Sequence, residues 1–158
     1  MGDQLGNLTL IEALREHPFT AGLSCAQVDR LAELATEVTF EEDEVILLDG
    51  QRSTSFYLVT SGSVVVELRS PRYVVCVQSL CPGTVFGWSA LLDRQDTLFQ
   101  VRAREHTVAL QIGGAALKAR CFEDPALGAE LFHRILNVVA GRVKATELRF
   151  AEMCGVKV

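Results

Sequence analysis

The chain has 158 residues, the length of one domain and enough to bury a substantial hydrophobic core. Its 15 lysines and arginines against 20 aspartates and glutamates give a net charge of −5, so it lacks the basic face that nucleic acids require. The five cysteines are scattered without a CxxC pair, and no window reaches the roughly 18 apolar residues of a membrane span. We therefore expect a soluble cytoplasmic protein with reduced thiols, no metal and no membrane or nucleic-acid partner.

The first part of the chain, residues 8–37, is predicted to be helical. Apolar residues recur at helical spacing before Pro18, which resists continuation of a helix: Leu10, Ile11 and Leu14. Ser24 is a suitable N-cap for a second helix, whose apolar stripe consists of Val28, Leu31, Leu34 and Ala35. Both helices are expected to pack on a larger unit.

Between residues 38 and 112 the pattern changes to short β-branched or aromatic runs, separated by glycine, proline, serine and aspartate. The runs predicted to be strands are residues 45–48, 55–59, 63–68, 73–77, 98–101 and 107–110. About six to eight short strands at this spacing indicate an antiparallel sandwich or barrel.

Helical periodicity returns in residues 115–153, as a short helix over 115–121 and a long one from about Pro125 to about Met153. The long helix carries a stripe with the 4-3 spacing of a coiled-coil seam: Phe132, Leu136, Val139, Val143, Thr146, Phe150 and Met153. Beyond Gly141 only this seam is apolar, so we predict a homodimer in which Arg142 and Glu147 form an ion pair between the chains. The alternative is that the stripe packs back on the strands.

Four segments of the sequence carry a family resemblance: "HPFTAGLS", "FYLVTSG", "GTVFG" and "DPALGAELFHRI". Together they resemble the cyclic-nucleotide-binding domains of the catabolite activator protein family, from His17 to about Met153. The resemblance implies an α+β fold: a cupin-like antiparallel β-roll, flanked by N-terminal helices and a long C-terminal helix. It also implies one domain over residues 1–158 with a regulatory function.

In that family the segment after Phe-Gly is a phosphate-binding cassette, a one-turn helix whose backbone N–H groups face the cyclic phosphate. The resemblance places in this cassette Phe86, Gly87, Trp88, Ser89, Ala90 and Leu91. The family's glutamate for the ribose hydroxyl and its arginine for the phosphate are replaced here by Trp88 and Thr97. Losing both anchors costs roughly 4–8 kcal/mol, so we expect the usual nucleotides to bind poorly.

Other side chains near the cassette offer partial compensation. Arg94 lies in the same loop and is a candidate surrogate ligand for a phosphate, and Arg102 on the following strand is another. Trp88 could fill the mouth of the roll, stack on a planar ligand or contact a partner protein.

The leading hypothesis is a regulatory domain that binds a small metabolite or a partner protein at an atypical cassette and signals through its last helix. One alternative is a genuine receptor for cyclic AMP or cyclic GMP that uses backbone amides, Arg94 and Trp88; another is a ligand-free structural adaptor. The three histidines are isolated and no nucleophile has a partner base, so we expect neither an enzyme nor a cofactor. Because only five residues follow Met153, we also expect no DNA-binding domain.

Overall fold

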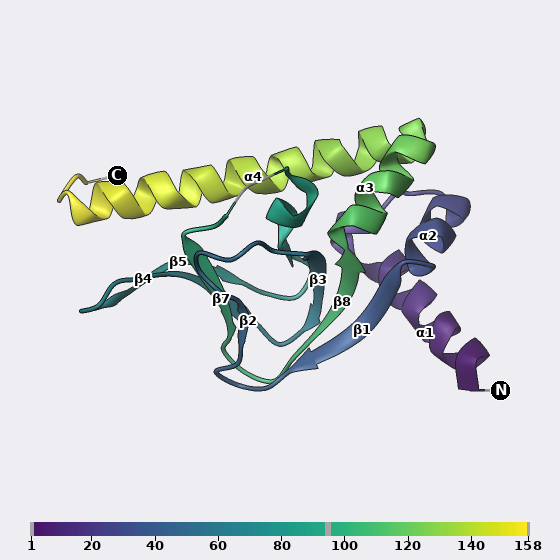
Figure 1. The fold of residues 1–158 in the computed structure, drawn as a ribbon, viewed down its shortest axis with the longest axis horizontal. Helices are drawn as coiled ribbons and strands as arrows, with labels where there is room; N and C mark the ends of the chain where they lie inside the picture. Colours follow the sequence, from purple (N-terminus) through teal and green to yellow (C-terminus); the bar gives the residue numbers. More distant parts are fainter. Residues whose placement is uncertain (1, 94–95, 158) are drawn as a thin grey trace.

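The computed structural model describes residues 2–93 and 96–157, with side chains from residue 9 onward. Two helices come first, then a β-roll, then two further helices (Figure 1). The helical elements are α1 (Gly2–Glu16), η1 (Pro18–Thr20), α2 (Cys25–Ala32), η2 (Trp88–Leu91), α3 (Gly114–Glu123) and α4 (Pro125–Met153). Within the described residues, none of the helices combines the length and the apolar character needed to span a bilayer.

The β-roll consists of two antiparallel sheets, which confirms the predicted α+β fold class. The strands of the described chain are β1 (Ala35–Phe40), β2 (Val45–Leu47), β3 (Ser55–Ser61), β4 (Val64–Arg69), β5 (Val74–Leu80), β6 (Val85–Phe86), β7 (Phe99–Ala103) and β8 (Thr107–Gly113). Their order is β1-β8-β3-β6 in one sheet and β2-β7-β4-β5 in the other. All six predicted strands are present, several of them two or three residues longer than expected.

The prediction of helix through residue 37 is wrong at its end. The helix α2 begins as expected, with a capping box between Ser24 and Gln27, but it ends at Ala32. Ala35 opens β1 instead, and the whole of β1 pairs with β8, from Ala35 opposite Ile112 to Phe40 opposite Thr107. The β-branched side chains of β1 favour a strand, and the long-range pairing with β8 overrides the helical stripe.

One buried cluster joins the helices to the first sheet. It includes Leu14 of α1, Leu31 of α2, Leu110 of β8, and Leu127 and Leu131 of α4. A second cluster fills the roll itself and contains Val59, Val64, Val66, Phe86 and Val101. The first half of α4 is therefore a core element.

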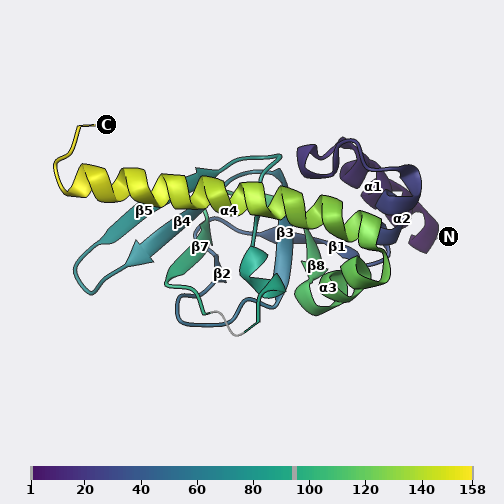
Figure 2. The same ribbon diagram turned by 90° about the horizontal axis from the view of Figure 1, so that it is seen from above.

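The second half of α4 leaves this helical core and crosses the roll (Figures 1 and 2). After Ile135 none of the described α4 side chains is fully buried. Arg142 lies against the second sheet, where its Nε–H donates to Oε1 of Gln78 on β5 at 2.7 Å. The helix then continues over the β4–β5 hairpin toward the C-terminus, far from the N-terminus (Figure 2).

An ion pair inside the second sheet joins β4 to β7. Glu67 is only 3% exposed, and its two carboxylate oxygens accept hydrogen bonds from Nε and Nη2 of Arg102 at 2.9 and 3.0 Å. Arg102 also donates to Asp43, and Gln100 donates to Glu67. The hydrogen bonds from Arg102 lower the pKa of Glu67 despite its burial.

Replacing Glu67 by glutamine should destabilise the domain by about 2–4 kcal/mol, because Arg102 would lose its buried partner while keeping Asp43. The pKa of Glu67 is lower in the folded chain, so its contribution is present above the ordinary pKa of a glutamate and is lost as the pH falls through the folded value. Chemical unfolding at pH 7 and pH 3 checks both points. Glu152→Gln is the control: it removes the exposed partner of Arg149 and should change little. Equal losses for Glu67→Gln at both pH values would contradict the assignment.

Candidate functional site

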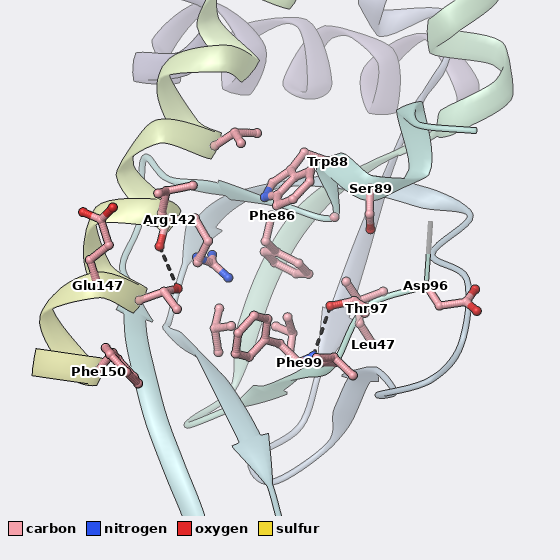
Figure 3. A pocket seen from close by; sticks show the side chains of 17 residues that line it. Leu47, Phe86, Trp88, Ser89, Asp96, Thr97, Phe99, Arg142, Glu147 and Phe150 are labelled. Carbon is pink, nitrogen blue, oxygen red and sulfur yellow. Dashed lines mark hydrogen bonds between the residues drawn. The ribbon is translucent and has the colours of Figure 1, made fainter. Parts of the chain in front are cut away.

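A cavity of about 540 Å³ lies between the open end of the roll and α4 (Figure 3). Its floor is apolar and is formed by Leu47, Val66, Phe86, Phe99 and Val101. The segments 87–89 and 96–98 form part of its rim, and α4 forms a wall with Val139, Arg142, Val143, Thr146, Glu147 and Phe150. The volume lies within the range of small-molecule sites.

The backbone of the cassette depends on Gly87. It has a φ of +81°, in the left-handed region, and begins the one-turn helix η2. A Cβ at this position would lie 2.4 Å from the carbonyl oxygen of Ser55, so no other residue fits. Next to it, Phe86 and Leu91 are buried, and Phe86 stacks on Tyr57 with 4.7 Å between ring centroids.

The cassette also abuts the last pair of helices. Gly114 opens α3, and a Cβ on it would lie 2.4 Å from the carbonyl oxygen of Ala90 in η2. The close approach of α3 to η2 therefore requires a glycine at this position, and the cassette touches the element that leads into α4.

Gly87→Ala should destabilise the domain by several kcal/mol, because the substitution combines left-handed strain with a collision against the backbone at Ser55. The matched control is Gly50→Ala. Gly50 has a similar φ of +74° but no atom within 4 Å of a built Cβ, so only the strain of about 1–2 kcal/mol applies. Thermal or urea unfolding of the two variants measures the difference. A loss at Gly87 no larger than that at Gly50 would refute the close contact.

The structure brings most of the predicted cassette residues to the cavity. Gly87, Trp88, Ser89 and Thr97 line it together with Phe86. Trp88 is half-buried and packs against the helical core, while Thr97 Oγ1 accepts a hydrogen bond from the Phe99 N–H at 3.1 Å. Ala90 and Leu91 belong to η2 and are not among the described lining residues. Arg94 lies outside the described residues.

Trp88 and Thr97, the positions at which the family resemblance implies charged anchors, both line the cavity. Arg102, the second candidate surrogate, is bound to Glu67 and Asp43 and is not among the described lining residues. The segment forms a one-turn helix after Gly87, and neither Trp88 nor Thr97 carries a charge.

The predicted seam of α4 divides into two groups. Val139, Val143, Thr146 and Phe150 line the cavity, so this part of the stripe borders the chain's own roll, although Val143 is still 51% and Phe150 70% exposed. Phe132, Leu136 and Met153 are exposed and are not among the described lining residues; Leu136 is 64% and Met153 65% exposed. The alternative in which the stripe packs back on the strands therefore describes part of it.

The sequence did not predict that Arg142 lines the cavity. Its guanidinium points from α4 toward Phe86, whereas the carboxylates of Asp96 and Glu147 point away from the cavity (Figure 3). Burial lowers the pKa of Arg142 to about 10, so the guanidinium is charged at neutral pH. Its spacing from Val139 and Thr146, three and four residues along a helix, was the available signal that all three share one face.

The sequence pattern of the family described as "Cyclic nucleotide-binding domain" matches residues 37–124, more than half of the chain. The chain belongs to this family. Its fold, its cassette backbone and the motifs of its sequence agree with this assignment, and the family consists of regulatory binding domains. Among the described residues, no group of three or more histidine, cysteine, aspartate and glutamate side chains could hold a metal ion.

Individual relatives differ in what surrounds the domain. A candidate potassium channel protein of Rhodopseudomonas palustris is 27% identical over 139 residues, which are 87% of this chain and 32% of that protein. The chain thus spans about a third of that relative's length. A crystal structure of a candidate cyclic nucleotide-binding protein from Geobacter metallireducens is 27% identical, with a TM-score of 0.73 and coverage of 84% of this chain and 96% of that chain.

The third relative is the regulatory subunit of a cAMP-independent protein kinase A from Trypanosoma brucei. It is 19% identical, with a TM-score of 0.72 and coverage of 95% of this chain and 52% of that chain, and the likeness shows the fold. A variant of the same protein with three substitutions, one of them threonine to arginine, is bound to cAMP.

Proposed function

We propose that this domain is a regulatory module that binds a small ligand between its roll and α4, without using the cassette side chains that read a cyclic phosphate. The observation that carries the proposal is the replacement of both charged anchors by Trp88 and Thr97 at the lining of an otherwise intact cavity. Losing both anchors would raise the Kd for a cyclic nucleotide by about three to six orders of magnitude.

The signalling element in this proposal is α4. Its first half is fixed in the helical core by Leu127, Leu131 and Ile135, while its second half forms one wall of the cavity. A ligand that contacts both the roll and this wall binds one position of α4 better than another, which is the condition for a population shift. The role is one of binding and regulation rather than catalysis.

A thermal unfolding panel tests the proposal. Cyclic AMP, cyclic GMP and cyclic dinucleotides at millimolar concentration should leave the midpoint unchanged. A ligand present at about 100 times its Kd would instead raise it by about 5–10 °C. A shift of that size with any of these nucleotides, abolished by Arg94→Ala, would establish the receptor alternative that relies on Arg94 and overturn the proposal.

The positive control for this panel is the double variant Trp88→Glu, Thr97→Arg, which restores both anchors on the existing backbone. It should show the shift with a cyclic mononucleotide that the unmodified domain lacks. The threonine-to-arginine change in the cAMP-bound variant of the Trypanosoma brucei protein supports this design. If the double variant is folded and still gives no shift, then Trp88 and Thr97 are not what excludes the nucleotides.

We also propose that two copies of the domain associate through the exposed part of the α4 seam, at Leu136 and Met153, with Phe132 beside them. Replacing both Leu136 and Met153 by glutamate should convert a dimer into a monomer in sedimentation, because charges would enter an apolar contact. Asn137→Glu is the control, since Asn137 is exposed on α4 outside the seam. Equal mass for the double variant and the unmodified domain would remove the dimer from the proposal. Val143 and Phe150 are unsuitable for this test because they also line the cavity.

A further inference from the structure

Arg142 holds a charge at an apolar cavity without a carboxylate partner in the described part of the chain. A guanidinium has five N–H donors, and the Nε–H of Arg142 is used by Gln78 at 2.7 Å. The remaining four donors, on Nη1 and Nη2, have no described protein partner, and the side chain points inward toward Phe86 (Figure 3). Other half-buried arginines of the chain, such as Arg102 and Arg120, are bound to carboxylates.

Burying a cation without a counter-ion costs free energy, and the binding of an anion from outside the protein offsets that cost. The planar fork of Nη1 and Nη2 matches two oxygens of one acid group. Among the described residues that line the cavity, Arg142 is the only cation. The described lining residues therefore supply the charge to neutralise one acid group.

The rest of the cavity sets the chemistry of the remainder of the ligand. Its walls are apolar or aromatic, with Phe86 and Phe99 from the roll, Trp88 from the cassette and Val143 and Phe150 from α4. The carboxylates of Asp96 and Glu147 point away from the cavity (Figure 3), so neither pairs with Arg142 in place of a ligand.

We propose that Arg142 is the anion-binding residue of this site, and that its ligand is a mostly apolar organic acid with an aromatic or branched hydrocarbon body and a single carboxylate. This inference rests on the proposed function, because it assigns a ligand class to the same cavity. It moves the anion contact from the cassette to α4, so the element that binds the charge is the one proposed to transmit the signal.

A matched pair of dyes tests the inference on the intact chain. 8-Anilinonaphthalene-1-sulfonate carries one negative charge, on a sulfonate that stands in for the carboxylate of the proposed ligand. N-phenyl-1-naphthylamine has the same aromatic body without a charge. Trp88 is the only tryptophan in the sequence and lines the cavity, so energy transfer from it reports binding at this site. We expect the anionic dye to bind at least tenfold more tightly than the neutral one.

The preference should disappear in Arg142→Gln and be partly retained in Arg142→Lys, which keeps the charge but not the fork. Arg149→Gln is the matched control, because Arg149 lies on the same helix, pairs with Glu152 and is not among the described lining residues. It should bind both dyes as the unmodified domain does. Thermal unfolding of each variant confirms that it is folded before its affinities are compared.

Displacement of the anionic dye by carboxylic acids of the proposed class gives the second readout. Phenylpropanoate and indole-3-acetate should displace the anionic dye at lower concentration than their neutral amides, and this difference should vanish in Arg142→Gln. Equal affinity for the two dyes, or an anionic preference that survives in folded Arg142→Gln, overturns the assignment of Arg142 but leaves the ligand-binding cavity in place. Energy transfer to neither dye counts against the cavity itself, and with it against the proposed function.

Discussion

The architecture depends on a division within one helix. Leu127, Leu131 and Ile135 anchor the start of α4 in the core that it shares with α1, α2 and the first sheet. Because a helix of this length is a nearly straight rod, that anchoring fixes the path of the residues that follow. Val138 and Val139 still pack against the edge of that core, and the residues after them cross the mouth of the roll and line the cavity. The cavity exists because α4 is held at one end.

The site separates backbone geometry from side-chain chemistry. The positive φ of Gly87 and the buried Phe86 and Leu91 fix the shape of the cassette whatever ligand is bound. Trp88 and Thr97 line the cavity beside that shape, and neither carries a charge. A family fold is thus compatible with more than one ligand chemistry, because the residues that build the turn are different from those that select its contents.

Much of the fold was predictable because its signals are local. The β-branched runs between turn residues located six strands, and Pro125, a favourable first-turn residue, marked the start of α4, where Asp124 accepts a hydrogen bond from Leu127 N–H. The strand β1 was missed because it follows α2 within a few residues, and its partner β8 lies far along the chain. Its short apolar run has no local feature that separates a strand from the end of a helix.

The site was harder to predict for a different reason. A 4-3 spacing shows which side chains share a face of a helix but not what covers that face. Val139, Val143 and Phe150 therefore fit a dimer seam and a cavity wall equally well in the sequence, and only the path of α4 across the roll separates these residues from Leu136 and Met153. The same spacing predicts Arg142 in a contact between chains, and within the single chain its guanidinium lies beside Gln78 of the roll.

The contact between Gly114 and Ala90 gives the molecule a mechanical property. Since α3 has no room to approach η2 more closely, a displacement of the cassette toward α3 would also have to move α3, which leads into Asp124, where α4 begins. From that pivot α4 extends over 29 residues, or roughly 43 Å at 1.5 Å per residue. A rotation of about 5° of a rod of that length about its held end would carry the far end through roughly 4 Å, so a small change of angle in the helical core becomes a large change of position beyond the roll.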